Sequence, residues 1–221
     1  MPRLQRPRHI WDAPLLIAMS AAAPAAAATG ESQAWTTESL IVRASDADTI
    51  HLDTSQRFRR DSSGGGQQTL RILIDHRVAR GVQIGGGIGY FRSSPEQEMR
   101  LFQQVTLSSG AWAARSRIEQ RFFDTADKAS WRLRQRVQGS LPLGAATQWT
   151  LVAATELMFH LNRARPGDKL GLAVMRNQIG LRRPVGKALN VQILYMRQQS
   201  FRDGRPDAVA HIPWLTLSWE I

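Results

Sequence analysis

Apolar and polar residues alternate along most of the chain with a period of two. Val82, Ile84 and Ile88 share one parity, and so do the apolar residues of the closing stretch WLTLSWEI. This period places successive side chains on opposite faces of a β-strand, and no segment shows the period of an amphipathic helix. The pattern predicts an all-β fold with strands near residues 34–43, 49–59, 68–78, 82–91, 97–108, 111–122, 130–140, 147–158, 170–182, 188–199 and 210–221.

The length of these segments favours a transmembrane barrel over a soluble sandwich. They run to about ten to twelve residues, whereas strands of soluble proteins usually have about five or six, and a tilted strand needs about 9–11 to cross a bilayer. Aromatic residues gather at strand ends, as in the two aromatic girdles of outer-membrane barrels. One set comprises Phe58, Tyr90, Phe91, Phe122, Phe123, Trp131, Phe159 and Phe201, and the other comprises Trp35, Trp112, Trp149 and Trp214.

The expected architecture is therefore an antiparallel transmembrane β-barrel of about 10–12 strands. Short connections such as ARG, SSG and PVGK alternate with longer polar ones such as NRARPGD and FRDGRPDA. This alternation is typical of periplasmic turns and outward loops. The pattern gives an odd number of strands, so either residues 34–43 form an N-terminal arm beside ten strands or a twelfth strand escapes the pattern. The glycine-rich GGGIGYF stretch lies inside a period-two segment, which argues against a dinucleotide-binding loop.

The N-terminus has the features of a cleavable signal peptide. Arg3, Arg6 and Arg8 precede a short, alanine-rich apolar stretch that ends in the A-x-A sequence of residues 26–28. We expect residues 1–28 to be the signal peptide and residues 29–221 to be one barrel domain. Removal of residues 1–28, which hold three arginines and Asp12, lowers the formal charge from +11 to +9. That charge is then carried by an exported protein, which excludes cytoplasmic nucleic acid as its natural partner. The chain has no cysteine and therefore no disulfide framework.

Arginine is concentrated on two neighbouring segments, RSRIEQRF at 115–122 and WRLRQRV at 131–137. Charge on a lipid-facing wall costs about 2–4 kcal/mol per arginine at the bilayer midplane, so we expect the apolar parity to face outward and the charged parity to face the lumen. The residues expected to line the lumen are Arg115, Arg117, Glu119, Arg121, Arg132, Arg134, Arg136, Glu156 and Arg176.

Two functions suit such a lumen. The first is a small pore or transport barrel for anionic solutes, since arginine binds carboxylates with paired hydrogen bonds. The second is a closed structural or envelope-interaction barrel, in which the same arginines pair with Glu98, Glu119 and Glu156. A lipid-modifying enzyme is less favoured, because His160 has no serine beside it and the sequence offers no catalytic constellation, cofactor motif or metal-ligand spacing.

The amino-acid sequences of the predicted strands resemble those of the outer-membrane β-barrel family called domain of unknown function 2490. The resemblance covers essentially residues 29–221 and rests on EMRLFQQ, RSRIEQRF, WRLRQRV, TELMFHLN and RNQIGL, in that order. It implies a barrel in the bacterial outer membrane and no particular reaction. The terminal Ile221 departs from the phenylalanine that outer-membrane assembly signals usually carry.

The expected partners follow from this location. They are outer-membrane lipid, the assembly machinery of that membrane and, for a pore, small anionic solutes. Loop arginines would either contact the phosphates of lipopolysaccharide or simply form a solvated loop surface. These are Arg59, Arg60, Arg92, Arg163, Arg165, Arg202 and Arg205.

Overall fold

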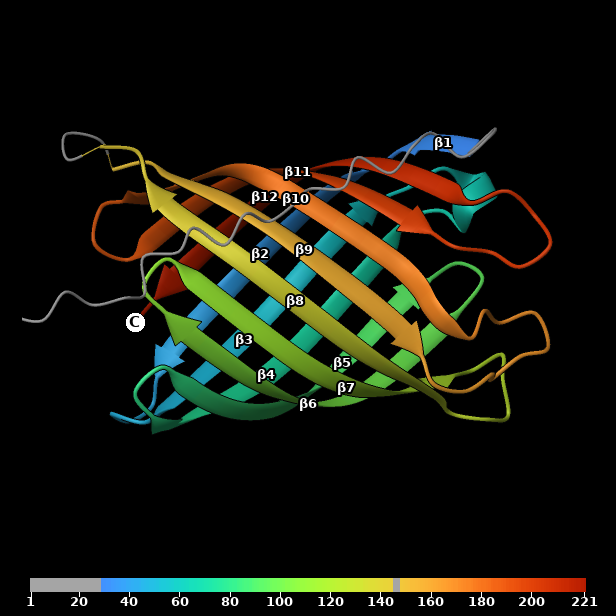
Figure 1. Cartoon of the computed structure of the whole chain (residues 1–221), viewed down its shortest axis with the longest axis horizontal. Helices are drawn as coiled ribbons and strands as arrows, with labels where there is room; N and C mark the ends of the chain where they lie inside the picture. Colours follow the sequence, from blue (N-terminus) through green and yellow to red (C-terminus); the bar gives the residue numbers. More distant parts are fainter. Residues whose placement is uncertain (1–28, 145–147) are drawn as a thin grey trace, which may run out of the picture.

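The computed structural model describes residues 29–144 and 148–221, and the expected signal peptide lies outside the described residues. Its strands wrap into a closed barrel with mostly long connections at one end and mostly short ones at the other (Figure 1). The elements are β1 (Thr29–Ser32), β2 (Ala34–Arg43), β3 (Asp48–Phe58), the 3-10 helix η1 (Asp61–Ser63), β4 (Gln67–Ala79), β5 (Val82–Ser93), β6 (Gln97–Ser109), β7 (Trp112–Phe123), β8 (Ser130–Pro142), β9 (Thr150–His160), β10 (Gly171–Val185), β11 (Leu189–Ser200) and β12 (Ala208–Glu220).

Each strand predicted from the alternation is present, and β2 has the predicted bounds, residues 34–43. The GGGIGYF stretch lies in β5, as its period indicated. Neighbours along the chain pair antiparallel from β2 to β12, so the barrel is a continuous meander. The all-β prediction is therefore confirmed, and the antiparallel one holds for every pair within the meander.

The barrel closes by a parallel seam, which neither sequence alternative anticipated. β12 pairs parallel with β2, in register from Trp214 opposite Trp35 to Glu220 opposite Ile41. Residues 34–43 are therefore a strand of the wall and not an arm, and eleven strands, β2 to β12, complete the circle. The short β1 continues the line of β2 and pairs parallel with the start of β12.

An odd number of strands places the two ends of the described chain at opposite ends of the barrel. Thr29 lies opposite Ala208, beside the 201–207 connection, at the end with the longer connections. The C-terminus lies at the other end, with the short turns (Figure 1). We call these the long-loop end and the short-turn end.

The wall is charged inside and apolar outside. In β6, Glu98, Arg100, Phe102 and Gln104 are buried, and the residues between them are exposed. Many large apolar side chains project from the outer surface, including Leu70, Ile72, Ile74, Ile84, Ile88, Leu101, Val105, Leu107, Ile193 and Leu215. Water-soluble proteins show the reverse arrangement, with charged groups on the surface and apolar ones in the core.

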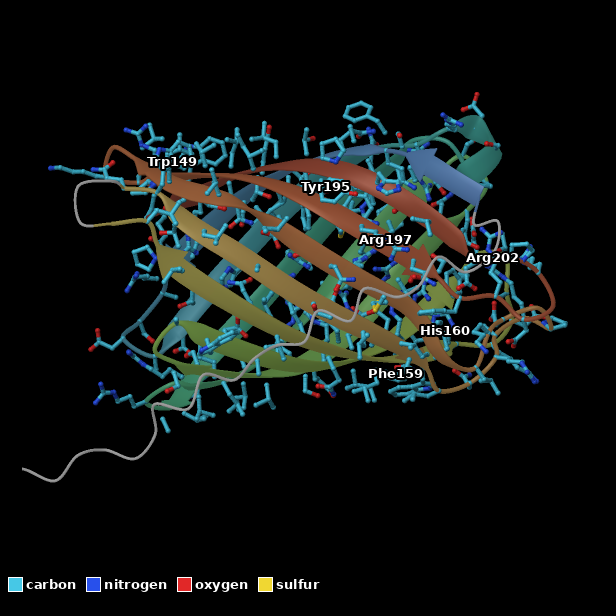
Figure 2. All side chains as sticks on the ribbon, turned by 45° about the horizontal axis from the view of Figure 1, so that its top comes forward. Trp149, Phe159, His160, Tyr195, Arg197 and Arg202 are labelled. Carbon is cyan, nitrogen blue, oxygen red and sulfur yellow. The ribbon has the colours of Figure 1, made fainter. Side chains whose placement is uncertain are left out.

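The aromatic residues divide between the two faces of the wall. Phe58, Tyr90 and Trp131 are exposed on the outer surface, and Trp149 and Phe159 lie toward opposite ends of the barrel (Figure 2). Trp35 and Phe91 are 4% and 6% exposed and belong to the interior, so their assignment to girdles was wrong. Their parity decides this, because Trp35 shares the inward face of β2 with the buried Ser39, and Phe91 shares the inward face of β5 with Gly87, which lies against Phe102.

The described residues contain no helix long and apolar enough to cross a membrane. Strand β5 carries glycines on its inner face, and a Cβ on Gly87 would lie 2.7 Å from the ring of Phe102 and 2.1 Å from a carbonyl oxygen of β4. Glycine there lets the Phe102 ring lie directly on the strand.

Candidate functional site: the arginine-rich interior

The interior charges originate in the pairing of β7 with β8. The register places Arg115 opposite Arg136, Arg117 opposite Arg134, and Glu119 opposite Arg132. Residues directly opposite one another share a face, so both charged runs point to the same side of the wall. Like charges in facing positions repel, and the arginines therefore need carboxylates nearby.

Glu119 is the first of three carboxylates that bind several arginines. It is 1% exposed and accepts hydrogen bonds from Arg132 Nε at 2.8 Å and from Arg134 Nη1 at 2.7 Å. Arg117 lies 3.8 Å away on the same strand. A charged side chain without water persists only where such partners surround it.

Glu156, from β9, is the second carboxylate. Its side chain is 2% exposed and accepts hydrogen bonds from Arg134 Nη2 at 2.7 Å and from Arg115 Nη2 at 2.8 Å. Arg176, directly opposite on β10, approaches to 3.7 Å. Arg134 therefore bridges Glu119 and Glu156, and this chain of contacts links β7 to β10.

Glu98 forms the third such group, nearer the long-loop end. Arg100 and Arg121 each donate two hydrogen bonds to it, with Nε to Oε1 distances of 2.5 Å in both cases. Paired donation of this kind is the strongest geometry available between a guanidinium and a carboxylate.

The structure brings the nine residues expected to line the lumen to one connected region. Arg121 pairs with Glu98. The other five arginines contact Glu119 or Glu156, and they are Arg115, Arg117, Arg132, Arg134 and Arg176. Arg136 is half-buried beside them and donates to the side-chain oxygen of Gln138 at 2.8 Å.

The opposite wall carries interior residues that the sequence reasoning missed. Arg71 is bound to Asp53, with an Nε to Oδ2 distance of 2.8 Å. Asp75 accepts a hydrogen bond from Gln104, which in turn accepts one from Arg117 Nε at 3.0 Å. The alternation of polar and apolar residues could have placed these residues in the interior, because they occupy the polar positions of β3, β4 and β6. They are too irregularly spaced along the chain to form a charged run like those of β7 and β8.

Arginines outnumber carboxylates in this interior. The carboxylates are Asp53, Asp75, Glu98, Glu119 and Glu156, and the arginines are Arg57, Arg71, Arg100, Arg115, Arg117, Arg121, Arg132, Arg134, Arg136 and Arg176. Several arginines also lie over aromatic rings, which attract cations. Arg100 Cζ is 3.5 Å from the centroid of Phe91, and Arg117 Cζ is 4.2 Å from that of Phe102.

Two cavities lie among these side chains. The smaller, of about 120 Å³, reaches across the barrel from Trp35 and Arg57 to Arg132 and Arg176. The larger, of about 290 Å³, has His51, Gln83 and Gln138 in its wall. Asp53, Arg71 and Arg117 belong to the walls of both cavities, so these three side chains stand between them.

Side chains of the loops join across the long-loop end. Arg165, from the 161–170 connection, is ion-paired with Glu96 and lies 2.5 Å from Thr125 Oγ1. Its guanidinium also lies over Phe123, at 4.6 Å. Arg59, at the base of another connection, donates to the carbonyl of Gly65 at 2.9 Å, and partial burial lowers the pKa of its guanidinium. Three separate connections are thus held together at this end.

The chemistry of the interior is that of ion pairing. Over residues 29–144 and 148–221, no three histidine or acidic side chains lie close enough together to hold a metal ion. His160 Nδ1 is 3.1 Å from the carbonyl oxygen of Lys169, a backbone contact at the end of β9. The arrangement can bind negative charge and can link strands across the lumen.

The fold and the interior define a closed β-barrel with a buried network of salt bridges. The chain belongs to the family described as "Protein of unknown function (DUF2490)", which it matches over residues 32–209. The resemblance inferred from the strand texts is confirmed. The chain is also 26% identical, over 200 residues, to an uncharacterized protein of Methylorubrum extorquens, covering 85% of this chain and 86% of that protein.

Proposed function

We propose that this protein is an integral β-barrel of the bacterial outer membrane whose lumen is closed at mid-height by ion pairs, serving as a structural or envelope-interaction barrel. The wall has apolar side chains on its outer face and charged side chains on its inner face, and this distribution supports the membrane location. Apolar side chains stand on the outside, with Ile74 51% and Ile193 56% exposed, while Arg117 inside is 2% exposed. A lipid environment makes this distribution favourable and water makes it costly.

The main support for a closed lumen is the burial of its ion pairs. Glu119, Glu156 and Arg117 have side chains only 1–2% exposed. A water-filled channel through this level would expose these side chains. Arg134, hydrogen-bonded to two of the carboxylates, lies in the centre of the occluding layer.

An anion-selective passage is the second candidate. The surplus of arginine favours it, and so does the meeting of the two cavities at Asp53, Arg71 and Arg117. In that case the arginines would attract anions to the lumen and a small displacement at these three residues would join the cavities.

The long-loop end would face outward in either case. The C-terminus and the short turns then face the periplasm, as is usual for such barrels. Exposed arginines at the long-loop end, including Arg60, Arg92, Arg163 and Arg205, would meet the phosphates of lipopolysaccharide. We propose this lipid as the nearest partner of the outer rim.

Single-channel recording of the purified, refolded protein in a planar bilayer distinguishes the two functions. The closed barrel predicts that Arg134→Ser increases the current, and the pore predicts that the same substitution decreases it. For a closed barrel, the native protein is silent and the variant, which lacks the central bridge, shows current steps. For an arginine-lined pore, the native protein conducts anions and the variant conducts fewer.

The matched control is Arg92→Ser, which removes an exposed arginine on the outer parity of β5. It should behave as the native protein does. Heat-modifiable migration and circular dichroism show whether each variant has folded. Steady anion-preferring current from the native protein would reject the closed barrel.

A further inference from the structure

Three arginines around the smaller cavity have no carboxylate at hydrogen-bonding distance. The nearest carboxylate oxygens lie 3.7 Å from Arg176 and 3.8 Å from Arg117, and within the described parts of the chain Arg57 has none within 4.0 Å. Each donates instead to the amide oxygen of a glutamine, the pairs being Arg57–Gln67, Arg117–Gln104 and Arg176–Gln198. Their positive charge is therefore only partly balanced.

Two of these arginines meet at one aromatic ring. Arg57 Cζ lies 4.1 Å from the centroid of Trp35, and Arg176 Cζ lies 5.3 Å from it. The two side chains come from β3 and β10, which are not neighbours in the sheet. The ring itself is fixed, because it packs edge-on against Trp214 at 5.6 Å and donates its Nε1 hydrogen to Gln33 at 2.9 Å.

This arrangement is unfavourable unless negative charge is present. Two like charges repel more strongly where little water screens them, and the indole offsets only part of that repulsion. The Nε atom of Arg57 is buried and has no hydrogen-bond partner. An unsatisfied donor on a charged group is among the costlier features that a folded protein retains.

We propose that the smaller cavity is a binding site for a small oxyanion of the phosphate or sulfate type, held between Arg57 and Arg176 beside Trp35. A guanidinium presents two parallel N–H groups to such an anion. The cavity of about 120 Å³ equals the liquid volume of roughly four water molecules. That space accommodates one tetrahedral oxyanion.

The remaining wall of the cavity supports the same ligand. Arg100, Arg132 and Arg134 also line it, already paired with carboxylates, and add positive potential without competing as ligands. The site uses Arg57 and Trp35, which lie outside the arginine runs of β7 and β8. Its occupancy does not depend on whether the barrel conducts.

Calorimetric titration of the purified, refolded barrel with sodium phosphate tests the site. Sodium chloride at matched ionic strength serves as the blank, and sulfate and acetate serve as competitors. We expect saturable binding of phosphate, displacement by sulfate and little displacement by acetate. Arg57→Gln and Arg176→Gln should each raise the dissociation constant at least tenfold, whereas Arg80→Gln, in the exposed turn between β4 and β5 at the short-turn end, should leave it unchanged.

Urea unfolding supplies a second readout that a merely structural role would not reproduce. Without phosphate, Arg57→Gln removes an unbalanced charge and should raise the urea midpoint. With saturating phosphate the order should reverse, because only the native site gains stability from the ligand. Should a glutamine variant fail to fold, Arg57→Lys retains the charge, loses the paired donors and should bind phosphate more weakly.

Two results would overturn the proposal. One is the absence of saturable phosphate binding, and the other is an equal affinity in the native protein and in both glutamine variants. Neither result bears on the closed barrel, which the bilayer recordings test separately.

Discussion

The substitution Glu156→Gln tests the buried network directly. Glutamine has almost the same shape but no charge, so the change removes the negative charge that Arg134, Arg115 and Arg176 share. Glu156 accepts hydrogen bonds at 2.7–3.1 Å from the first two and lies 3.7 Å from the third. Its side chain is 2% exposed, so water cannot replace the lost interaction.

The expected loss of stability follows from the burial of Glu156. Removing one partner of a buried ion pair typically costs about 3–5 kcal/mol, because the remaining charge stays uncompensated. Three arginines are affected here, and the glutamine amide oxygen still accepts one hydrogen bond. We therefore expect the free energy of unfolding to fall by about 3–5 kcal/mol.

The assay is urea-induced unfolding of the protein in lipid vesicles, followed by tryptophan fluorescence and by migration on unheated gels. Glu220→Gln is the control, since Glu220 is 44% exposed and lies 3.8 Å from the exposed Arg43. A surface pair of this kind contributes about 0–1 kcal/mol. If Glu156→Gln cost no more than the control, water would have to screen Glu156, and the dry, salt-bridged interior would be refuted.

Two further predictions concern the wall and its orientation. Gly87→Ala places a methyl group 2.7 Å from the ring of Phe102 and should destabilise the barrel by about 1–3 kcal/mol in the same urea assay, whereas Gly30→Ala, with nothing within 4 Å of the added Cβ, should be neutral. In the proposed outer-membrane location, an epitope tag inserted directly before Thr29 should be reached by antibody on intact cells, as should one in the 161–170 connection. A C-terminal tag should be reached only after the outer membrane is opened. Accessibility of the tags at both chain ends, or of neither, would contradict the odd strand number.

The local sequence predicted the wall of the barrel well. Along β6, each inward residue from Glu98 to Gln104 is separated from the next by one outward residue. This spacing can be read from the amino-acid sequence alone. The same rule put the arginines of β7 and β8 on one face. Prediction succeeds here because the period of two is a property of the single strand and needs no knowledge of its neighbours.

The aromatic residues show the limit of that rule when parity is ignored. Trp35 was grouped with Trp112 because both lie near strand ends. Trp112 is 43% exposed, whereas Trp35 is 4% exposed and lies beneath Arg57 inside the barrel. Position along a strand sets the height of a side chain, and parity sets its face, so both are required.

The sequence by itself determined an all-β chain, the approximate limits of its strands, the charged interior face and the family to which the chain belongs. Only the tertiary structure decided the parallel closure of β2 on β12, the odd strand number and the pairing of each arginine. The physical reason is distance along the chain. Trp35 and Trp214 become neighbours only when the sheet curves through a full circle, and Arg57 meets Arg176 only across the lumen that this closure creates.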